Sequence, residues 1–331
     1  MIDFRYHLVS IIAVFLALAV GLVVGATALS GPALVGLQKA EKTVSSENAA
    51  LLKERRALTS QVSADQVFAT AAGPRLLPGV LADEKVVLVE APNADSAVAS
   101  GLTAALHLAG ATVTGTVTLN QAFLDTSGVN EARLKELAQQ LAHTAGVPLP
   151  AQLSGPVGAQ QAAAQVLAAS LLTTSGPGMS SADSQAILTG LSQGNFISVS
   201  PAAIQPASLA VLITPGGPPA AAGSQVLVAT AVALRNASSG TVMAGAIQSI
   251  GTPSVISAED TAGQVSTVDF ADTEIGQITT VWALRQLLDG KPPAQYGIAT
   301  QAVPTPAPTP SVTPTTTPTP STSTHTTGAH K

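Results

Sequence analysis

The feature that most constrains this chain is an uncharged apolar segment close to its start. Residues 8–29 hold no Asp, Glu, Lys or Arg and consist mainly of Leu, Val, Ile and Ala. As a helix this run would be roughly 33 Å long, which matches a bilayer hydrocarbon core of about 30 Å. Its polar members, Ser10 and Thr27, can bond back to helix carbonyls. The sequence therefore predicts a membrane anchor over residues 1–33 that contains a single span.

A cleaved signal peptide is the competing interpretation, because Ala26-Thr27-Ala28 resembles a cleavage site. Signal sequences, however, have apolar regions of about 7–15 residues that follow a basic segment. Here the apolar run is longer, and Arg5 is offset by Asp3. We favour an uncleaved anchor. Gly21 and Gly25 form a small-residue face that lets two anchors pack closely, or they are small residues of an Ala-rich span and nothing more.

The residues that follow, 34–72, predict a coiled-coil stalk. One seam position repeats every seven residues as Leu37, Val44, Leu51 and Leu58. The other seam position holds Leu34, Glu41, Asn48, Arg55 and Val62. An Asn in such a seam can fix a parallel dimeric register at some cost in stability. We expect a homodimer through the stalk; the alternative is an amphipathic helix that packs on its own domain. Gly73-Pro74 is expected to end the helix.

The C-terminal segment, residues 301–331, is a low-complexity tail of Pro, Thr and Ser. Such a composition cannot bury enough apolar surface to fold and favours an extended, disordered chain. Ser/Thr-Pro segments also resemble O-glycosylated stalks, which lie outside the cytoplasm. The charges that flank the anchor are nearly balanced and do not fix its orientation. The tail therefore favours a globular domain on the extracytoplasmic side, and His325 and His330 are read as solvated tail residues.

Residues 80–300 predict a globular α/β domain with an open, mostly parallel sheet, because strand and helix patterns alternate. The expected strands are 86–89, 113–119, 196–199, 209–213, 241–245 and 265–268. The expected helices are 95–109, 130–145, 158–173, 181–193, 220–234 and 272–288. The first strand is a continuous apolar run, as in parallel strands buried on both faces.

Composition excludes several classes of function. The net charge is −5 and only 10% of residues are charged, so no basic stripe is available for nucleic acid. The chain has no cysteine, which excludes disulfides, thiolate metal sites and a cysteine nucleophile.

Ligands of open α/β sheets bind beyond the carboxyl ends of the strands, and two loops there carry suggestive residues. Thr214–Pro219 is a Gly- and Pro-rich turn into a helix, where an anion can bind; a plain tight turn is the favoured interpretation. Asp269, Asp272 and Glu274 follow the last strand and suggest a carboxylate pair or a hard-cation site. Helix capping is favoured there.

The remaining candidates point away from catalysis. Glu90 and Asp95 flank the first strand-to-helix loop, where capping is again the favoured reading. No G-x-S-x-G elbow is present, and His107 and His143 lack a nearby nucleophile. Met179 and Met243 are isolated, so no soft-metal site follows from their spacing. We expect no enzyme, no catalytic or cofactor-binding residue and no identifiable metal ligands.

Several motifs nevertheless resemble those of a known family. Met1–Ser10 and the apolar run after it are similar to the opening of actinobacterial copper transport proteins of the MctB family. Ser266–Asp269, Gly276-Gln277 and Tyr296-Gly297 resemble the C-terminal signature of that family, and the section ending in Gly110–Gly115 also fits. The resemblance spans most of residues 1–299.

This resemblance implies an envelope protein of copper transport or copper homeostasis. Only the resemblance, and no residue pattern, implies a role in copper handling. The residues depart from a copper conduit in two ways. They show no copper ligand set, and one helical span with an α/β domain does not resemble an outer-membrane barrel. A pore would require oligomerised anchors, and the apolar run 8–29 has no ionisable residue to line one. The alternative function is a coiled-coil scaffold that binds envelope or cell-division partners.

Overall fold

The computed structural model describes residues 4–149, 157–173, 178–215, 221–246 and 263–297. The chain divides into two units, Met1–Phe68 and Ala69–Lys331, each described by itself below. The predicted tail at 301–331, with both of its histidines, lies outside the described residues.

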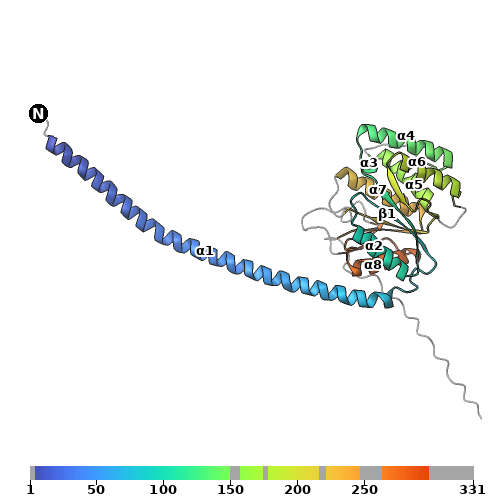
Figure 1. Cartoon of the computed structure of the whole chain (residues 1–331), viewed down its shortest axis with the longest axis horizontal. Helices are drawn as coiled ribbons and strands as arrows, with labels where there is room; N and C mark the ends of the chain where they lie inside the picture. The colour runs from blue at the N-terminus through green and yellow to red at the C-terminus, as the bar shows by residue number, and fades with distance from the viewer. Residues whose placement is uncertain (1–3, 150–156, 174–177, 216–220, 247–262, 298–331) are drawn as a thin grey trace, which may run out of the picture. The chain divides into compact units, whose positions relative to one another are not determined.

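A single long helix, α1 (Phe4–Leu76), makes up the first unit and enters the second (Figure 1). Its segment Arg5–Gly25 is long and apolar enough to cross a membrane, and no other helix in the described ranges meets that test. The helical backbone continues across Gly31 and Pro32, so no break separates the predicted anchor from the predicted stalk.

The expected end of this helix at Gly73-Pro74 is wrong, because the helix continues to Leu76. Proline removes one backbone donor from a helix. The turn around Pro74 nevertheless closes, since the amide of Leu77 donates to the carbonyl of Gly73 at 3.0 Å.

The second unit contains a seven-stranded sheet with the order β3-β2-β1-β4-β5-β6-β7. The strands are β1 (Lys85–Glu90), β2 (Thr112–Leu119), β3 (Ile197–Ser200), β4 (Leu209–Ile213), β5 (Gly240–Ala244), β6 (Ser266–Val268) and β7 (Gln295–Tyr296). All neighbouring strands pair in parallel except β2 and β3, which are antiparallel. The predicted open, mostly parallel α/β sheet is confirmed; the strand β7 was not predicted.

Helices connect these strands at close to the expected positions. They are α2 (Ser96–Leu108), α3 (Gln121–Leu124), α4 (Gly128–Ala145), α5 (Gly158–Leu171), α6 (Ser181–Gln193), α7 (Ala221–Ala237) and α8 (Glu274–Leu288). Of these only the four-residue α3 was not predicted.

The helices cover the sheet on two faces, each with its own apolar core. Val86 and Leu88 of β1 point to the face covered by α2 and α8. Val87 and Val89 point to the face covered by α3 to α7. Figure 1 shows α2 and α8 on one side of the sheet and α4 to α7 on the other. Every second residue of a strand faces the same way, so an unbroken apolar run supplies both cores.

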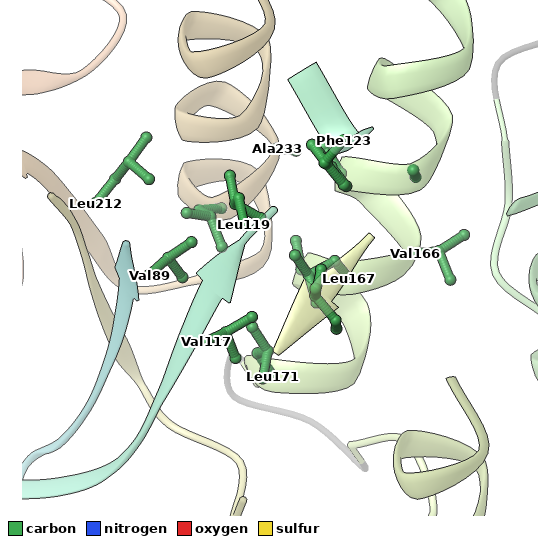
Figure 2. Close-up of a cluster of buried hydrophobic side chains, with 14 of the residues drawn as sticks. Val89, Val117, Leu119, Phe123, Val166, Leu167, Leu171, Leu212 and Ala233 are labelled. Atoms are coloured by element: carbon green, nitrogen blue, oxygen red, sulfur yellow. The ribbon is translucent and has the colours of Figure 1, made fainter. Parts of the chain in front are cut away.

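The core beneath α3 to α7 is mainly aliphatic. Figure 2 shows Val89, Leu119 and Leu212 of three neighbouring strands in one cluster with Leu167 of α5 and Ala233 of α7. Alanine is frequent on the buried faces of these helices, above all on α5. Small side chains let helices approach each other and the sheet closely, which accounts for five helices over one face.

Candidate functional site

The point where the sheet changes its winding direction lies between β1 and β4. The chain leaves β1 through α2 to reach β2 on one side, and leaves β4 through α7 to reach β5 on the other side. Such a point is the usual ligand crevice of an open α/β sheet.

Backbone contacts span this crevice in the described residues. The amide of Ala91 donates to the carbonyl of Ile213 at 2.8 Å. An isolated antiparallel bridge joins Ala94 to Pro215, and Pro215 is buried. The remainder of the predicted Thr214–Pro219 turn, residues 216–219, falls outside the described residues.

The two acidic residues that flank the loop between β1 and α2 have different structural roles. Asp95 caps α2, because its Oδ1 accepts from the amide of Ala97 at 2.8 Å; the predicted capping role is confirmed. Glu90 is no cap. Its Oε2 accepts from the hydroxyl of Thr118 on the neighbouring strand at 3.2 Å.

The three carboxylates after β6 differ in their exposure to solvent. Asp269 is only 5% exposed, whereas Asp272 and Glu274 are exposed. The residue that caps α8 is Thr273, whose Oγ1 accepts from the amide of Gly276 at 3.1 Å and donates to the carbonyl of Phe270 at 2.8 Å. Capping by Asp269 or Asp272 is therefore corrected to capping by Thr273. Glu274 lies in the first turn, where the helix dipole favours negative charge.

The C-terminal motifs of the family resemblance meet at the β6–β7 edge of the sheet. The amide of Asp269 donates to the carbonyl of Tyr296 at 3.2 Å. The Asp269 carboxylate lies so close to Gly297 that a Cβ built there would be 1.8 Å from its Oδ1. Only glycine fits at 297 while this carboxylate keeps its place.

Two further glycines allow equally close packing around α8. A Cβ at Gly276 would lie 1.9 Å from the carbonyl oxygen of Phe270. A Cβ at Gly101 of α2 would lie 2.2 Å from Nε2 of Gln277, which is nearly buried. These contacts hold the first turn of α8 against both its own preceding loop and α2. The Gly276-Gln277 pair is thus a packing element.

Tyr296 completes this edge. Its hydroxyl donates to Oε1 of Gln286 on α8. Burial raises the pKa of the Tyr296 hydroxyl. The side chain therefore ties β7 to α8 as a neutral phenol at ordinary pH.

The other predicted site residues lie apart. His107 and His143 are exposed on α2 and α4. Met243 is fully buried in the core, and Met179 packs against its margin. Among the described residues, no group of three or more His, Asp or Glu side chains is placed to hold a metal ion.

A groove lies between α5 and α7 on the described surface of this unit. It has a volume of about 450 Å³. Its polar lining consists of amides, among them Gln161, Gln165, Gln225 and Asn236, and its apolar lining includes Val232. The composition alone did not predict this groove, because its residues come from helices about 60 positions apart in the sequence.

The seam of the predicted stalk is the other distinctive surface. Its apolar side chains Leu37, Val44, Leu51 and Leu58 are 56–67% exposed on α1. The side chains of residues 5–24 in the anchor are likewise exposed. Apolar side chains in continuous rows of this kind mark surfaces that contact lipid or protein.

Comparison with known proteins agrees with these features. A family described as "Copper transport outer membrane protein, MctB" matches residues 1–306. The chain is 32% identical over 308 residues to "Copper transporter MctB" of Mycobacterium tuberculosis (strain ATCC 25618 / H37Rv), covering 90% of this chain and 96% of that protein. It is 33% identical over 312 residues to the protein of the same name from Mycobacterium leprae (strain TN), with the same coverage.

Proposed function

The chain belongs to the MctB copper transport protein family, and from this premise we propose that it controls the copper content of the cell as an envelope protein. The observation that carries the proposal is the match over residues 1–306, which includes the apolar helix as well as the α/β unit. Arg5–Gly25 anchors the protein in a membrane by one span.

The α/β unit lies on the extracytoplasmic side in this proposal. The Pro-, Thr- and Ser-rich composition of residues 301–331 supports this orientation. A protease added to intact, wall-stripped cells is then expected to cleave the α/β unit and leave the anchor. Protection of the whole chain in intact cells would reverse the orientation.

The protein acts without catalysis in this proposal. Asp272 and Glu274 are exposed carboxylates that follow β6, and Glu274 lies in the first turn of α8, where the helix dipole favours its charge. Asp272→Asn combined with Glu274→Gln is expected to leave copper handling unchanged. These positions are the right ones to change, because replacement of the buried Asp269 would confound function with stability.

Copper measurement in cells tests the central proposal. A deletion strain, a complemented strain and the parent are grown across a range of external copper, and cell-associated copper is measured by elemental mass spectrometry. Excess copper in the deletion strain, reversed by complementation, is the expected result. Unchanged copper together with altered cell shape or separation would favour the second candidate, a scaffold for envelope or cell-division partners, which the exposed seam also supports.

The active form in this proposal is a homodimer through the stalk. Val44 occupies a seam position and is 63% exposed on α1, so replacement by a charge should separate the copies. Val67 offers a matched control, since it lies off the seam and is 71% exposed. Val44→Glu should give monomers in detergent, whereas Val67→Glu should remain dimeric. Equal behaviour of the two variants would favour a helix that packs on its own domain.

A further inference from the structure

Glu54 and Arg55 are adjacent and opposite charges on α1: Arg55 occupies a seam position, and Glu54 directly precedes it. Both side chains are exposed. Within the described part of the chain, neither side chain takes part in a hydrogen bond or ion pair. A cation in a coiled-coil seam is costly unless an opposite charge accompanies it, so the position of Arg55 calls for a partner.

The helix itself does not supply that partner. Charged side chains on one helix interact when they are three or four positions apart. The residues at those distances from Glu54 and Arg55 are uncharged: Ala50, Leu51, Leu52, Ala57, Leu58 and Thr59. Adjacent residues point in different directions, so Glu54 and Arg55 of one copy do not face each other.

A second copy of the helix supplies the partner through the geometry of the coil. In a parallel coil each seam side chain inserts into a hole made by four residues of the facing helix. For Arg55 these four are Leu51, Glu54, Arg55 and Leu58 of the second copy. Glu54 of the second copy therefore lies beside Arg55 of the first, and the two-fold symmetry creates the same pair again.

We propose that the stalk pairs with a second copy of this chain as a parallel, in-register coil, held in register by two reciprocal Glu54–Arg55 pairs. The inference rests on the homodimer of the proposed function and names its register. The direction follows from the anchors: when both N-terminal spans lie in one membrane, both helices leave it the same way. The charge complementarity selects a second copy as the occupant.

The register follows from counting the pairs. A shift of one heptad places Arg55 of one copy beside Glu47 of the other, but places the second Arg55 beside Gln61. One pair is then lost, and the two-fold closure of a symmetric dimer is lost with it. Only the unshifted arrangement forms both pairs. Asn48 at the preceding seam position supports the same register, because Asn side chains match each other across a parallel dimer.

Reciprocal charge reversal tests this arrangement. In Arg55→Glu each copy carries two acidic residues at the contact, and in Glu54→Arg each copy carries two basic residues. Like charges then meet within either homodimer, and its dissociation constant should rise about tenfold or more. A mixture of the two variants restores both opposite-charge pairs and should form a heterodimer with the strength of the wild-type dimer.

The measurement uses the full chain in detergent, with the two variants labelled differently and followed by sedimentation and energy transfer. Arg56→Glu is the matched control: it makes the same charge change one position further along, off the seam, and should leave the dimer unchanged. Because the chain has no cysteine, Leu37→Cys adds an independent readout at a seam position that keeps Asn48 and the charge pairs. This variant should crosslink to itself at position 37 in the in-register dimer.

The outcomes distinguish the existence of the homodimer from its register. A wild-type chain that is monomeric overturns the homodimer of the proposed function. A dimeric wild type whose strength is unaffected by Arg55→Glu and Glu54→Arg, or variants that fail to pair with each other, overturn the register alone. Absence of the Leu37→Cys crosslink in a dimer also overturns the register.

Discussion

Replacement of Gly276 by alanine gives the sharpest test of the packing at the β6–β7 edge. An added Cβ would lie 1.9 Å from the Phe270 carbonyl oxygen and 2.8 Å from the Cα of Ala271. Real Cβ atoms essentially never come within 3.0 Å of another heavy atom, so backbone must move by more than 1 Å. No flexible side chain can yield here, because the obstructing atoms are main chain.

The magnitude follows from two opposing contributions. Overpacking of this kind costs about 1–3 kcal/mol, and a main-chain clash belongs at the upper end. Alanine in a helix is favoured over glycine by about 1 kcal/mol. The free energy of unfolding should therefore fall by about 2 kcal/mol. For a domain of this size the midpoint of thermal unfolding should drop by about 4–8 °C.

The only tryptophan, Trp282, lies on α8 and reports on this helix directly. Its fluorescence during heating or denaturant titration gives the measurement. Gly128→Ala is the matched control: Gly128 also lies in a helix, and an added Cβ would meet nothing within 4 Å. That variant should be as stable as the wild type or slightly more so. If Gly276→Ala unfolded at the same temperature and denaturant concentration as Gly128→Ala, the close packing of α8 on its preceding loop would be refuted.

Three further variants test other contacts of the α/β unit by the same unfolding measurement. Thr273→Ala removes the cap of α8 and should cost about 1 kcal/mol, while Thr273→Ser keeps the hydroxyl and should cost less. Leu212→Ala empties part of a fully buried position and should cost about 2–5 kcal/mol; Leu108→Ala, at a 40% exposed position, should change little. Tyr296→Phe should flatten the loss of stability at high pH. The folded pKa of Tyr296 is raised by burial, so its contribution is present below pH 10 and is lost as the pH rises through that folded pKa. If the free energy of unfolding of the wild type and of Tyr296→Phe changed identically between pH 9 and 12, the burial of this phenol would be contradicted.

The layered part of the fold could be predicted from the sequence because its signals are local. Val86–Val89 is apolar at every position, which a strand covered on both faces requires. Asp95 precedes an apolar helical face and caps it, as predicted. These patterns depend on the periods of strand and helix, which any short window of sequence displays.

Local sequence patterns could not predict the direction of β3 or the existence of β7. Strand direction depends on where the chain returns to the sheet, and β3 returns next to β2 after four intervening helices. β7 is only two residues long, too short to show any alternation. Pairing with β6 defines it, through the amide of Thr267 and the carbonyl of Ala294 at 3.0 Å.

The carboxylates after β6 illustrate the same limit at a candidate site. The sequence shows Asp269, Asp272 and Glu274 as near neighbours, but it does not show Gly297 arriving from 28 residues further along to cover Asp269. Nor does it show that Thr273 takes the capping position. The sequence does show Gly297 directly after Tyr296 of β7. Only the folded structure shows that this glycine makes room for the Asp269 carboxylate.

The reciprocal variants also connect the stalk to copper handling. If the active form is the homodimer, Arg55→Glu or Glu54→Arg alone should fail to return cell-associated copper to the parental level in the deletion strain. Expression of both together should succeed, because the mixed dimer regains both opposite-charge pairs. Arg56→Glu alone should complement fully. Complementation by either reversed variant alone, at parental protein abundance, would show that copper handling does not need the paired stalk, and would shift attention to the α/β unit.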